Sequence, residues 1–323
     1  NMKFDVIIGN PPYQLSDGTG GGGSSSVPLY NKFIDKAKQL NPIYLSMIIP
    51  ARWYTGGKGL TQFRKEMLSD KRILELHDFV DETECFNNLQ IEGGVCYFLW
   101  KHNYNGKCKV LNHKNGTVSS KNRYLDSISD DYFIRDNNSI SILNKVSKHN
   151  EKTINELVST SGPFGFRTNF KGQSNIKNMT NPISIYVSNR NVEYVEMNDI
   201  TKNIHYVDKY KVFLPKAYGS SGRNVAQKVI NNPFLGLPNQ ICTETYLMIN
   251  GVNSKKEAIN LKRYIETKFF RYMVYLMKSS QNISASTYSL VPLQDFSKTW
   301  TDKELYEKYK LTQEEIDYIE ETI

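Results

Sequence analysis

A short apolar run closed by two prolines places the strongest constraint on the fold of this chain. Val6, Ile7 and Ile8 form a β-branched stretch suited to an interior parallel strand, and Gly9 lets the chain turn as it leaves the sheet. Two consecutive prolines cannot continue the strand, because each lacks an N–H and has a fixed φ. The sequence therefore predicts a strand over residues 4–9 and a rigid segment directly after it.

That rigid segment, Asn10-Pro11-Pro12-Tyr13, carries groups that suit an amine. Open α/β sheets bind ligands in the crevice outside the carboxyl ends of their parallel strands, where this segment falls. The Asn10 side-chain oxygen and the Pro11 carbonyl can accept the two hydrogens of an exocyclic amine, and Tyr13 offers a face for the attached ring. Two aligned acceptors favour a pyramidal nitrogen and stabilise the positive charge that develops as it attacks a methylsulfonium. The segment predicts amine methylation without a covalent enzyme intermediate.

Strands and helices alternate over the first third of the chain. Apolar residues recur on one helix face within 29–37, and 59–69 has the pattern of a second amphipathic helix. Apolar runs predict further strands at 44–49, 73–79 and 93–100. This alternation is typical of a doubly wound α/β sheet.

The motif and its neighbouring segments resemble the adenine-specific DNA methyltransferases that use S-adenosyl-L-methionine. Asn10 to Tyr13 match the catalytic motif of that group, and the segments 44–53 and 84–98 are familiar from it, including its fused type II (IIG-like) restriction-modification enzymes. The resemblance covers residues 2–112 with specific motifs and the remainder more loosely. It implies a partial Rossmann-like methyltransferase sheet, a mixed α+β target recognition domain, S-adenosyl-L-methionine as cofactor and double-stranded DNA as partner.

The resemblance also implies roles for two further aromatic residues. Phe86 matches the position of a ring that stacks on an extruded base opposite Tyr13, so base flipping is expected. Phe33 matches a position near the adenine ring of the cofactor. For both rings, packing in the apolar core is the alternative.

No glycine turn for a cofactor precedes the motif. The glycine-rich stretch 18–26 follows it and lacks the strand–turn–helix context of such a site, so a loop beside a DNA-binding cleft is expected there. We expect the chain to be the C-terminal part of a longer enzyme whose upstream part holds most of the cofactor site. On that hypothesis the strand at 4–9 has an open edge, and the chain alone binds cofactor weakly or not at all and methylates nothing.

Composition narrows the setting and the partners. The sequence has 41 Lys and Arg against 33 Asp and Glu, a formal net charge of +8, which favours a polyanionic partner. It has no apolar run of about 18 residues and no signal-peptide pattern, so a cytoplasmic protein without a membrane segment is expected. Its four cysteines show neither Cys-x-x-Cys spacing nor a matching set of histidines, so no metal site is predicted.

The pattern divides the chain into four parts. We expect the second half of a methyltransferase catalytic domain at 1–112, a polar connector with short helical pieces at 113–150, a target recognition domain at 151–299 and a helical tail at 300–323. A long helix is expected at about 255–278. In the tail, Thr301 and Asp302 are candidate caps for the first of two short acidic helices.

Polar loops of the recognition region supply the candidates for DNA contacts. Arginine suits guanine and phosphate, and asparagine suits adenine. Ordinary solvated surface is the alternative for each of these residues, which are Arg167, Lys171, Arg223, Asn224 and Lys228.

Adenine-N6 methylation of DNA in a restriction-modification system is the leading functional hypothesis. An RNA base or a protein glutamine is an alternative acceptor, because enzymes acting on these also use Asn-Pro-Pro-Tyr. The long region after residue 112 disfavours the glutamine enzymes, which need no reading domain. A non-catalytic DNA-binding fragment is the other alternative. The Glu-x-Lys spacing at 266–268 falls in a helical pattern, so it predicts no nuclease site.

Overall fold

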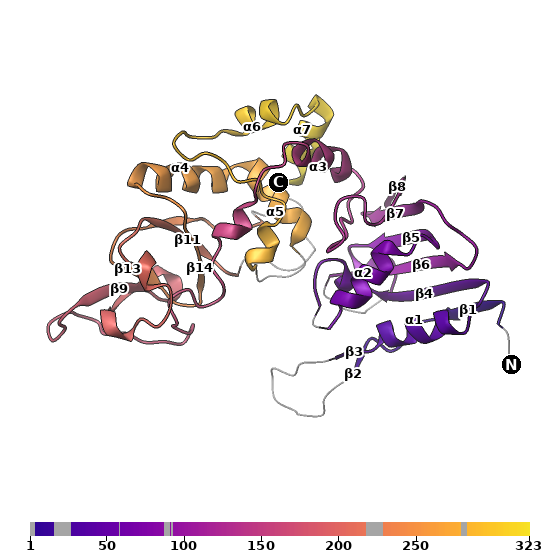
Figure 1. The fold of residues 1–323 in the computed structure, drawn as a ribbon, viewed down its shortest axis with the longest axis horizontal. Helices are drawn as coiled ribbons and strands as arrows, with labels where there is room; N and C mark the ends of the chain where they lie inside the picture. Colours follow the sequence, from indigo (N-terminus) through magenta and orange to yellow (C-terminus); the bar gives the residue numbers. More distant parts are fainter. Residues whose placement is uncertain are drawn as a thin grey trace. The chain divides into compact units, whose positions relative to one another are not determined.

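The computed structural model describes residues 4–15, 27–57, 59–86, 91, 93–217, 229–278 and 283–323. These residues form two compact units, unit 1 within residues 1–144 and unit 2 within residues 145–323 (Figure 1). The boundary falls inside helix α3 (Ser139–Ser147). Gly18 to Ser26, Arg223, Asn224 and Lys228 lie outside the described residues.

Unit 1 is built on a six-stranded mixed sheet with the order β1-β4-β6-β5-β7-β8. β1 pairs with β4 and β5 with β7 in parallel, and the other neighbours are antiparallel. The four strands predicted in this unit are confirmed. The bounds are β1 (Val6–Gly9), β4 (Tyr44–Pro50), β5 (Ile73–Phe79), β6 (Val95–Lys101), β7 (Cys108–Lys114) and β8 (Thr117–Arg123).

Helices α1 (Tyr30–Gln39) and α2 (Thr61–Ser69) cover one face of this sheet, and both were predicted. Alternation along β4 buries Leu45, Met47 and Ile49 against the helices. A short 3-10 turn, η1 (Ala51–Tyr54), carries Trp53 and Tyr54 into the same core. The remaining short elements near the motif are the paired strands β2 (Gln14–Leu15) and β3 (Val27–Pro28) and the 3-10 turn η2 (Glu82–Glu84).

Strand β1 is at the edge of the described sheet. Ile7 packs against the core, whereas Val6 and Ile8 point to the other face and are 52% and 78% exposed. Gly9 ends the strand as expected, but its backbone is not left-handed, and an added Cβ would make only an ordinary contact with Met47. The turn after β1 is therefore set by the prolines and does not depend on the conformational freedom of glycine.

The segment 113–123, expected to be part of a polar connector, instead completes the sheet. Asn115 and Gly116 have φ values of 53° and 72°, the left-handed pair of a two-residue hairpin turn. This turn joins β7 to β8, which pair along their whole length. The alternation of polar and apolar residues along β8 is too weak to predict a strand from the sequence. The Asn-Gly pair is by itself a signal for a hairpin turn.

Unit 2 combines two small sheets with helices, the mixed α+β architecture expected. One sheet has the order β10-β9-β13 and the other β12-β11-β14. The strands are β9 (Pro182–Tyr186), β10 (Val192–Glu196), β11 (Lys211–Pro215), β12 (Phe234–Gly236), β13 (Gln240–Cys242) and β14 (Tyr246–Ile249). Short 3-10 turns are η3 (Ile154–Leu157), η4 (Ser188–Arg190), η5 (Met197–Asp199), η6 (Ile204–Tyr206) and η7 (Ala285–Tyr288).

The prediction of one long helix at 255–278 is wrong in one respect, because the segment forms two helices. α4 (Lys255–Glu266) ends at Thr267, whose backbone is extended, and α5 (Lys268–Met277) begins directly after it. The Thr267 hydroxyl accepts the Phe270 amide and so caps the second helix.

The helical tail follows its capping signals. Thr301 caps α6 (Asp302–Lys308), and Thr312 caps α7 (Gln313–Thr322), each in a box with the glutamate three residues on. Asp302 has a different role from the one expected, since its carboxylate accepts the amides of Lys268 and Phe269 and so caps α5.

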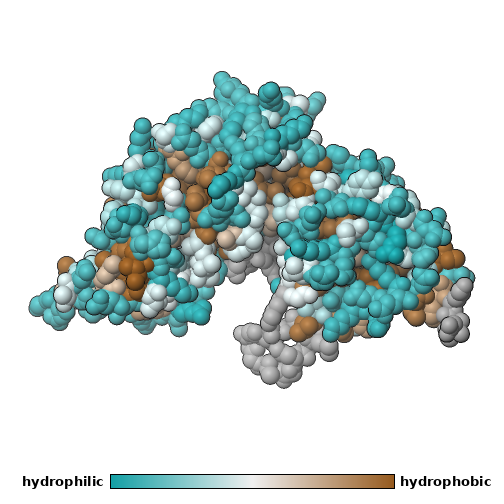
Figure 2. All heavy atoms as spheres, viewed as in Figure 1, coloured by the Kyte–Doolittle hydropathy of each residue, from teal (hydrophilic) through white to brown (hydrophobic). Residues whose placement is uncertain are grey.

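The visible surface of both units is largely hydrophilic, with apolar side chains exposed in small groups (Figure 2). Among the helices in the described ranges, none has the length and apolar character needed to cross a membrane.

Candidate active site

The Asn-Pro-Pro-Tyr segment lies at the carboxyl end of β1, as predicted. Asn10 and Pro12 are exposed, Pro11 is buried and Tyr13 is half-buried. The Tyr13 carbonyl accepts a hydrogen bond of 3.1 Å from the Leu29 amide. This bond ties the start of α1 to the end of the segment.

The Asn10 side-chain oxygen and the Pro11 carbonyl are the two acceptors of the segment that concern an amine. Among the described residues, no donor bonds the Asn10 side-chain oxygen or the Pro11 carbonyl. The prolines hold the backbone between them in a narrow range of conformations. An amine that enters here meets acceptors that need little reorganisation.

Tyr13 presents its ring as a neutral group. Its hydroxyl is buried and has no hydrogen-bond partner among the described residues. Burial raises the pKa of Tyr13 to about 12, with smaller contributions from Cys85 and Cys96. The phenol therefore keeps its proton at neutral pH, so the ring can stack on a ligand but the hydroxyl cannot serve as a base.

The chain around Phe86 approaches the same end of the sheet. Cys85 is close enough to Tyr13 to affect its pKa, and Phe86 is the next residue. The Phe86 amide donates to the Glu82 carbonyl at 2.8 Å, which holds the short turn η2 closed. Phe86 is only partly buried, and its role as a stacking partner stays a prediction.

Phe33 is not a core residue. Its neighbours on α1, Tyr30, Ile34 and Ala37, are buried, whereas Phe33 is 44% exposed. It lies one helical turn beyond Leu29, the residue bonded to Tyr13. Core packing, the alternative weighed for Phe33, therefore does not explain this ring.

A buried ion pair that the sequence did not reveal closes the loop carrying Phe86. Asp78 on β5 is fully buried and accepts two hydrogen bonds, of 2.9 and 2.6 Å, from Arg135. Arg135 also donates to the Gly93 carbonyl at 3.0 Å. A Cβ at Gly94 would lie 2.1 Å from the Phe79 carbonyl oxygen, so only glycine fits there. These contacts join the two ends of the loop between β5 and β6. In the sequence, the Gly-Gly pair directly before β6 was the signal for this close approach.

Buried tyrosine and tryptophan side chains surround Cys96, the second thiol that raises the pKa of Tyr13. The Tyr30 hydroxyl is buried without a partner among the described residues, whereas the buried Tyr54 hydroxyl and Trp53 indole N–H lie against the Cys96 thiol and interact with it. Burial raises the pKa of Cys96 to about 12 and raises that of Tyr30 and Tyr54 as well. These side chains stay neutral at neutral pH.

The DNA-contact candidates that the structure describes lie in unit 2. Arg167 is highly exposed and forms an ion pair of 3.2 Å with Glu244. Glu244 also accepts from Ser161 at 2.7 Å and pairs with Lys216 at 3.5 Å. Lys171 is exposed. The structure thus groups Arg167 and Lys171 on one loop of unit 2.

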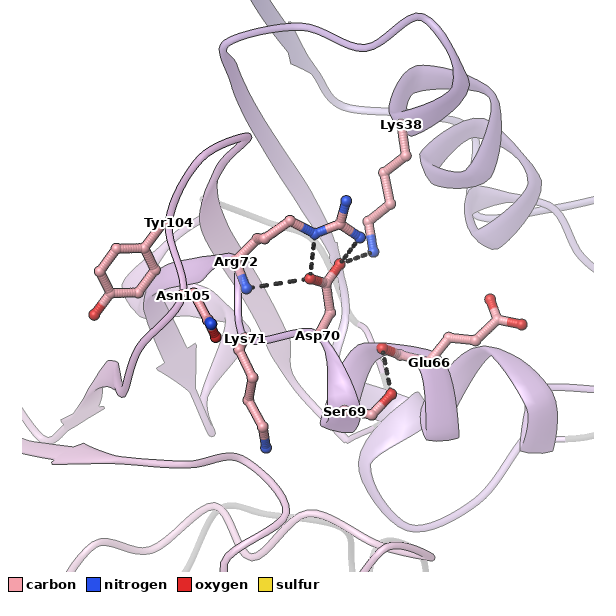
Figure 3. Close-up of a pocket in the computed structure, with 8 residues that line it drawn as sticks. All are labelled: Lys38, Glu66, Ser69, Asp70, Lys71, Arg72, Tyr104 and Asn105. Atoms are coloured by element: carbon pink, nitrogen blue, oxygen red, sulfur yellow. Dashed lines mark hydrogen bonds and ion pairs between the residues drawn. The ribbon is translucent and has the colours of Figure 1, made fainter.

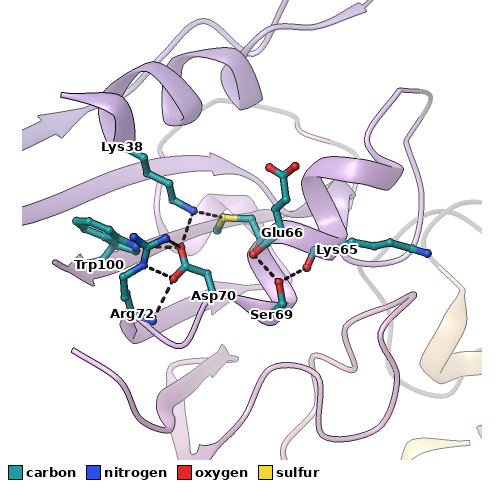
Figure 4. Close-up of polar contacts among 8 residues, drawn as sticks. Lys38, Lys65, Glu66, Ser69, Asp70, Arg72 and Trp100 are labelled. Atoms are coloured by element: carbon teal, nitrogen blue, oxygen red, sulfur yellow. Dashed lines mark hydrogen bonds and ion pairs between the residues drawn. The ribbon is translucent and has the colours of Figure 1, made fainter. Parts of the chain in front are cut away.

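A hollow of about 590 Å³ lies at the opposite strand ends of unit 1 (Figure 3). Asp70 accepts bonds there from Arg72 at 2.7 and 3.0 Å, from Lys38 at 2.9 Å and from the Trp100 indole at 3.0 Å (Figure 4). Burial favours the neutral acid, but the bonds from Arg72 and Lys38 outweigh it and lower the pKa of Asp70 to about 2. The cations of this hollow are therefore engaged in holding the unit together. No three His, Cys, Asp or Glu residues within the described ranges are grouped to hold a metal ion.

Comparisons with known proteins agree with the motif. Residues 1–86 match the Eco57I restriction-modification methylase family, a range that includes Asn10 to Tyr13, Phe33 and Phe86. An uncharacterized adenine-specific methylase of Mycoplasma pneumoniae is 42% identical over 134 residues. The match covers 41% of this chain and 31% of that protein, so the chain spans less than a third of the length of its relative. The first part of the chain is thus similar to adenine-specific methylases of restriction-modification systems.

Solved structures give weaker likenesses. The type IIL restriction-modification enzyme MmeI in complex with DNA has a TM-score of 0.46 at 12% identity, covering 88% of this chain and 46% of MmeI. The type IIG restriction endonuclease BpuSI has a TM-score of 0.37 at 12% identity, covering 95% of this chain and 49% of BpuSI.

Proposed function

We propose that this chain belongs to an enzyme that methylates the N6 amine of adenine in DNA as part of a restriction-modification system. The similarity of residues 1–86 to that methylase family supplies the reaction class. The observation that carries the proposal is the pair of acceptors, the Asn10 oxygen and the Pro11 carbonyl, that no described donor bonds, beside the half-buried ring of Tyr13.

The chemistry follows from the geometry of these acceptors. The lone pair of an aromatic amine is delocalised into its ring, which makes the nitrogen a poor nucleophile. Hydrogen bonds to Asn10 and Pro11 favour a pyramidal nitrogen and stabilise the positive charge that forms as its bond to the methyl carbon develops. Tyr13 stacks on the base and, with a pKa of about 12, leaves the proton lost by the amine to solvent.

S-adenosyl-L-methionine would supply the electrophilic methyl group. Phe33 fits one part of its site, because it is an exposed aromatic ring on the helix tied to Tyr13. We propose that this ring packs on the adenine of the cofactor. Removal of the ring by Phe33→Ala should then raise KM for the cofactor more than it lowers kcat.

The experiment expresses the natural gene in a host whose DNA lacks N6-methyladenine and measures that base by mass spectrometry after nuclease digestion. The wild-type gene should introduce the modified base, and Asn10→Ala should lower the rate at which it forms by at least two orders of magnitude. Asn105→Ala, at an exposed asparagine near the opposite strand ends of unit 1, is the matched control and should have no effect.

Other outcomes contradict the proposal. Methylation of RNA or of a protein glutamine, with DNA left unmodified, would assign the same amine chemistry to a different acceptor. Unmodified DNA, RNA and protein from a folded wild-type enzyme would leave only a DNA-binding role. Full activity of Asn10→Ala would remove the motif from the mechanism.

A further inference from the structure

Residues 167–178 form a polar arm on unit 2, a segment that we call the recognition arm. Apart from Phe170 and Gly172, every residue in it is exposed. The exposed residues include Lys171, Lys177 and Gln173, and lysine and glutamine side chains commonly donate hydrogen bonds to nucleic acids in protein complexes.

The recognition arm is held firmly at its base despite this exposure. Phe166 is buried in the core of unit 2, and its ring lies 4.5 Å from that of Phe170, which packs against the same core. A Cβ at Gly172 would lie 2.6 Å from the Tyr194 carbonyl oxygen, so the chain approaches β10 as closely as only glycine allows. The Gln173 and Tyr194 backbones then exchange two hydrogen bonds of 2.9 Å. The arm therefore presents its side chains from a fixed backbone.

All the charged residues between positions 157 and 192 are basic. Between Glu156 and Glu193 the sequence contains no acidic residue, whereas it contains Arg167, Lys171, Lys177 and Arg190. Among the described residues, no carboxylate forms an ion pair with Lys171 or Lys177, and the two glutamates that follow bind backbone amides. Glu193 accepts the Gly172 amide, and Glu196 accepts the amides of Thr180 and Asn181 at 2.7 and 2.9 Å.

Gln173 lies where the arm pairs with β10. Its backbone is fixed by both bonds to Tyr194, while no described residue bonds its side-chain amide. Asn175, by contrast, already accepts the Lys177 amide at 3.1 Å. A glutamine amide with both of its groups free can pair with the N6 and N7 edge of an adenine.

We propose that the recognition arm contacts duplex DNA, with Lys171 and Lys177 on phosphates and Gln173 on a base edge. The choice of DNA rests on the proposed function. Arg167 is a weaker contact than the two lysines, because its charge is shared with Glu244.

Salt-dependent binding tests the phosphate contacts. The affinity of the purified chain for a labelled mixed-sequence duplex is measured over a series of salt concentrations. Lys171→Gln and Lys177→Gln should each make the negative slope of log affinity against log salt less steep by about 0.9. Lys303→Gln removes the same charge from a side chain of unit 2 that is 86% exposed, and should leave the slope unchanged. Equal slopes for all variants would overturn the phosphate contacts.

The base contact is tested in the natural enzyme by sequencing that detects N6-methyladenine. Gln173→Ala should lower discrimination at one position of the methylated site by about tenfold or more, with other positions unchanged. An unchanged site in Gln173→Ala, together with loss of methylation in Asn10→Ala, would overturn the inference and leave the proposed function intact. If the wild-type enzyme methylates no DNA, the proposed function fails, and the salt series still decides whether the arm binds DNA.

Discussion

Replacing Asp70 by Asn should destabilise unit 1 without affecting the motif. The carboxylate joins Lys38 of α1, Arg72 before β5 and Trp100 of β6, and its own side chain is only 6% exposed. A fall in its pKa from the usual range to about 2 corresponds to about 2 kcal/mol of unfolding free energy at neutral pH. Asn keeps the shape and can still accept from Trp100, but it loses the charge that Lys38 and Arg72 favour.

Urea unfolding followed by tryptophan fluorescence measures this loss. Trp53 and Trp100 lie in unit 1 and Trp300 in unit 2, so a Trp300→Phe background makes the signal report unit 1. Asp131→Asn is the control, because Asp131 is 71% exposed and pairs with an exposed lysine. Such a surface pair contributes well under 1 kcal/mol.

The pH dependence separates the charge from other effects of the substitution. A carboxyl whose folded pKa is lowered stabilises the protein above its unfolded pKa, and this contribution disappears as pH falls from about 4 toward about 2. The difference between wild type and Asp70→Asn should therefore be constant from neutral pH to about 5 and shrink below that. A difference that persists unchanged at pH 3, or none at pH 7, would refute the assignment.

Two further predictions concern buried contacts of each unit. Arg135→Ala should destabilise unit 1 by about 3–5 kcal/mol in urea unfolding, because it leaves the buried Asp78 carboxylate without its cation. Adding Asp78→Asn should recover part of that loss. If it recovers none, the buried charge is not the cause. Thr267→Ala should cost about 1 kcal/mol in the thermal unfolding of unit 2, because it removes the bond to the Phe270 amide and leaves only the Asp302 cap of α5. Thr267→Ser should keep most of the stability, and equal losses in the two variants would contradict a capping role.

The parts of the fold that the sequence predicted are those set by local covalent limits. Pro11 and Pro12 cannot extend β1, so the strand end and the rigid segment followed directly. The cap of α6 was likewise predicted, because threonine is a preferred residue directly before the first turn of a helix. Such signals depend on neighbours in the chain, which a sequence displays.

The missed features depend on neighbours in space. Thr267 looks like an ordinary residue of a helical pattern, and the break there is stabilised by Asp302, far along the chain. The pair of Asp78 and Arg135 joins residues 57 positions apart, so no spacing rule reveals it. Phe33 fits the apolar periodicity of α1, and only the packed structure shows that its ring stays outside the core.

The open edge of β1 affects how the protein must be handled. Among the described strands β1 pairs only with β4, and such an edge strand can template pairing with another chain; the exposed Val6 and Ile8 add an apolar surface on the sheet face opposite the core. Self-association through this edge would grow with protein concentration, and would change both the apparent unfolding free energy and the amount of chain free to bind DNA. Dilution series therefore belong with every binding and unfolding measurement on this chain, and Ile8→Lys, which places a charge on the edge, is the substitution to use when a monomer is needed.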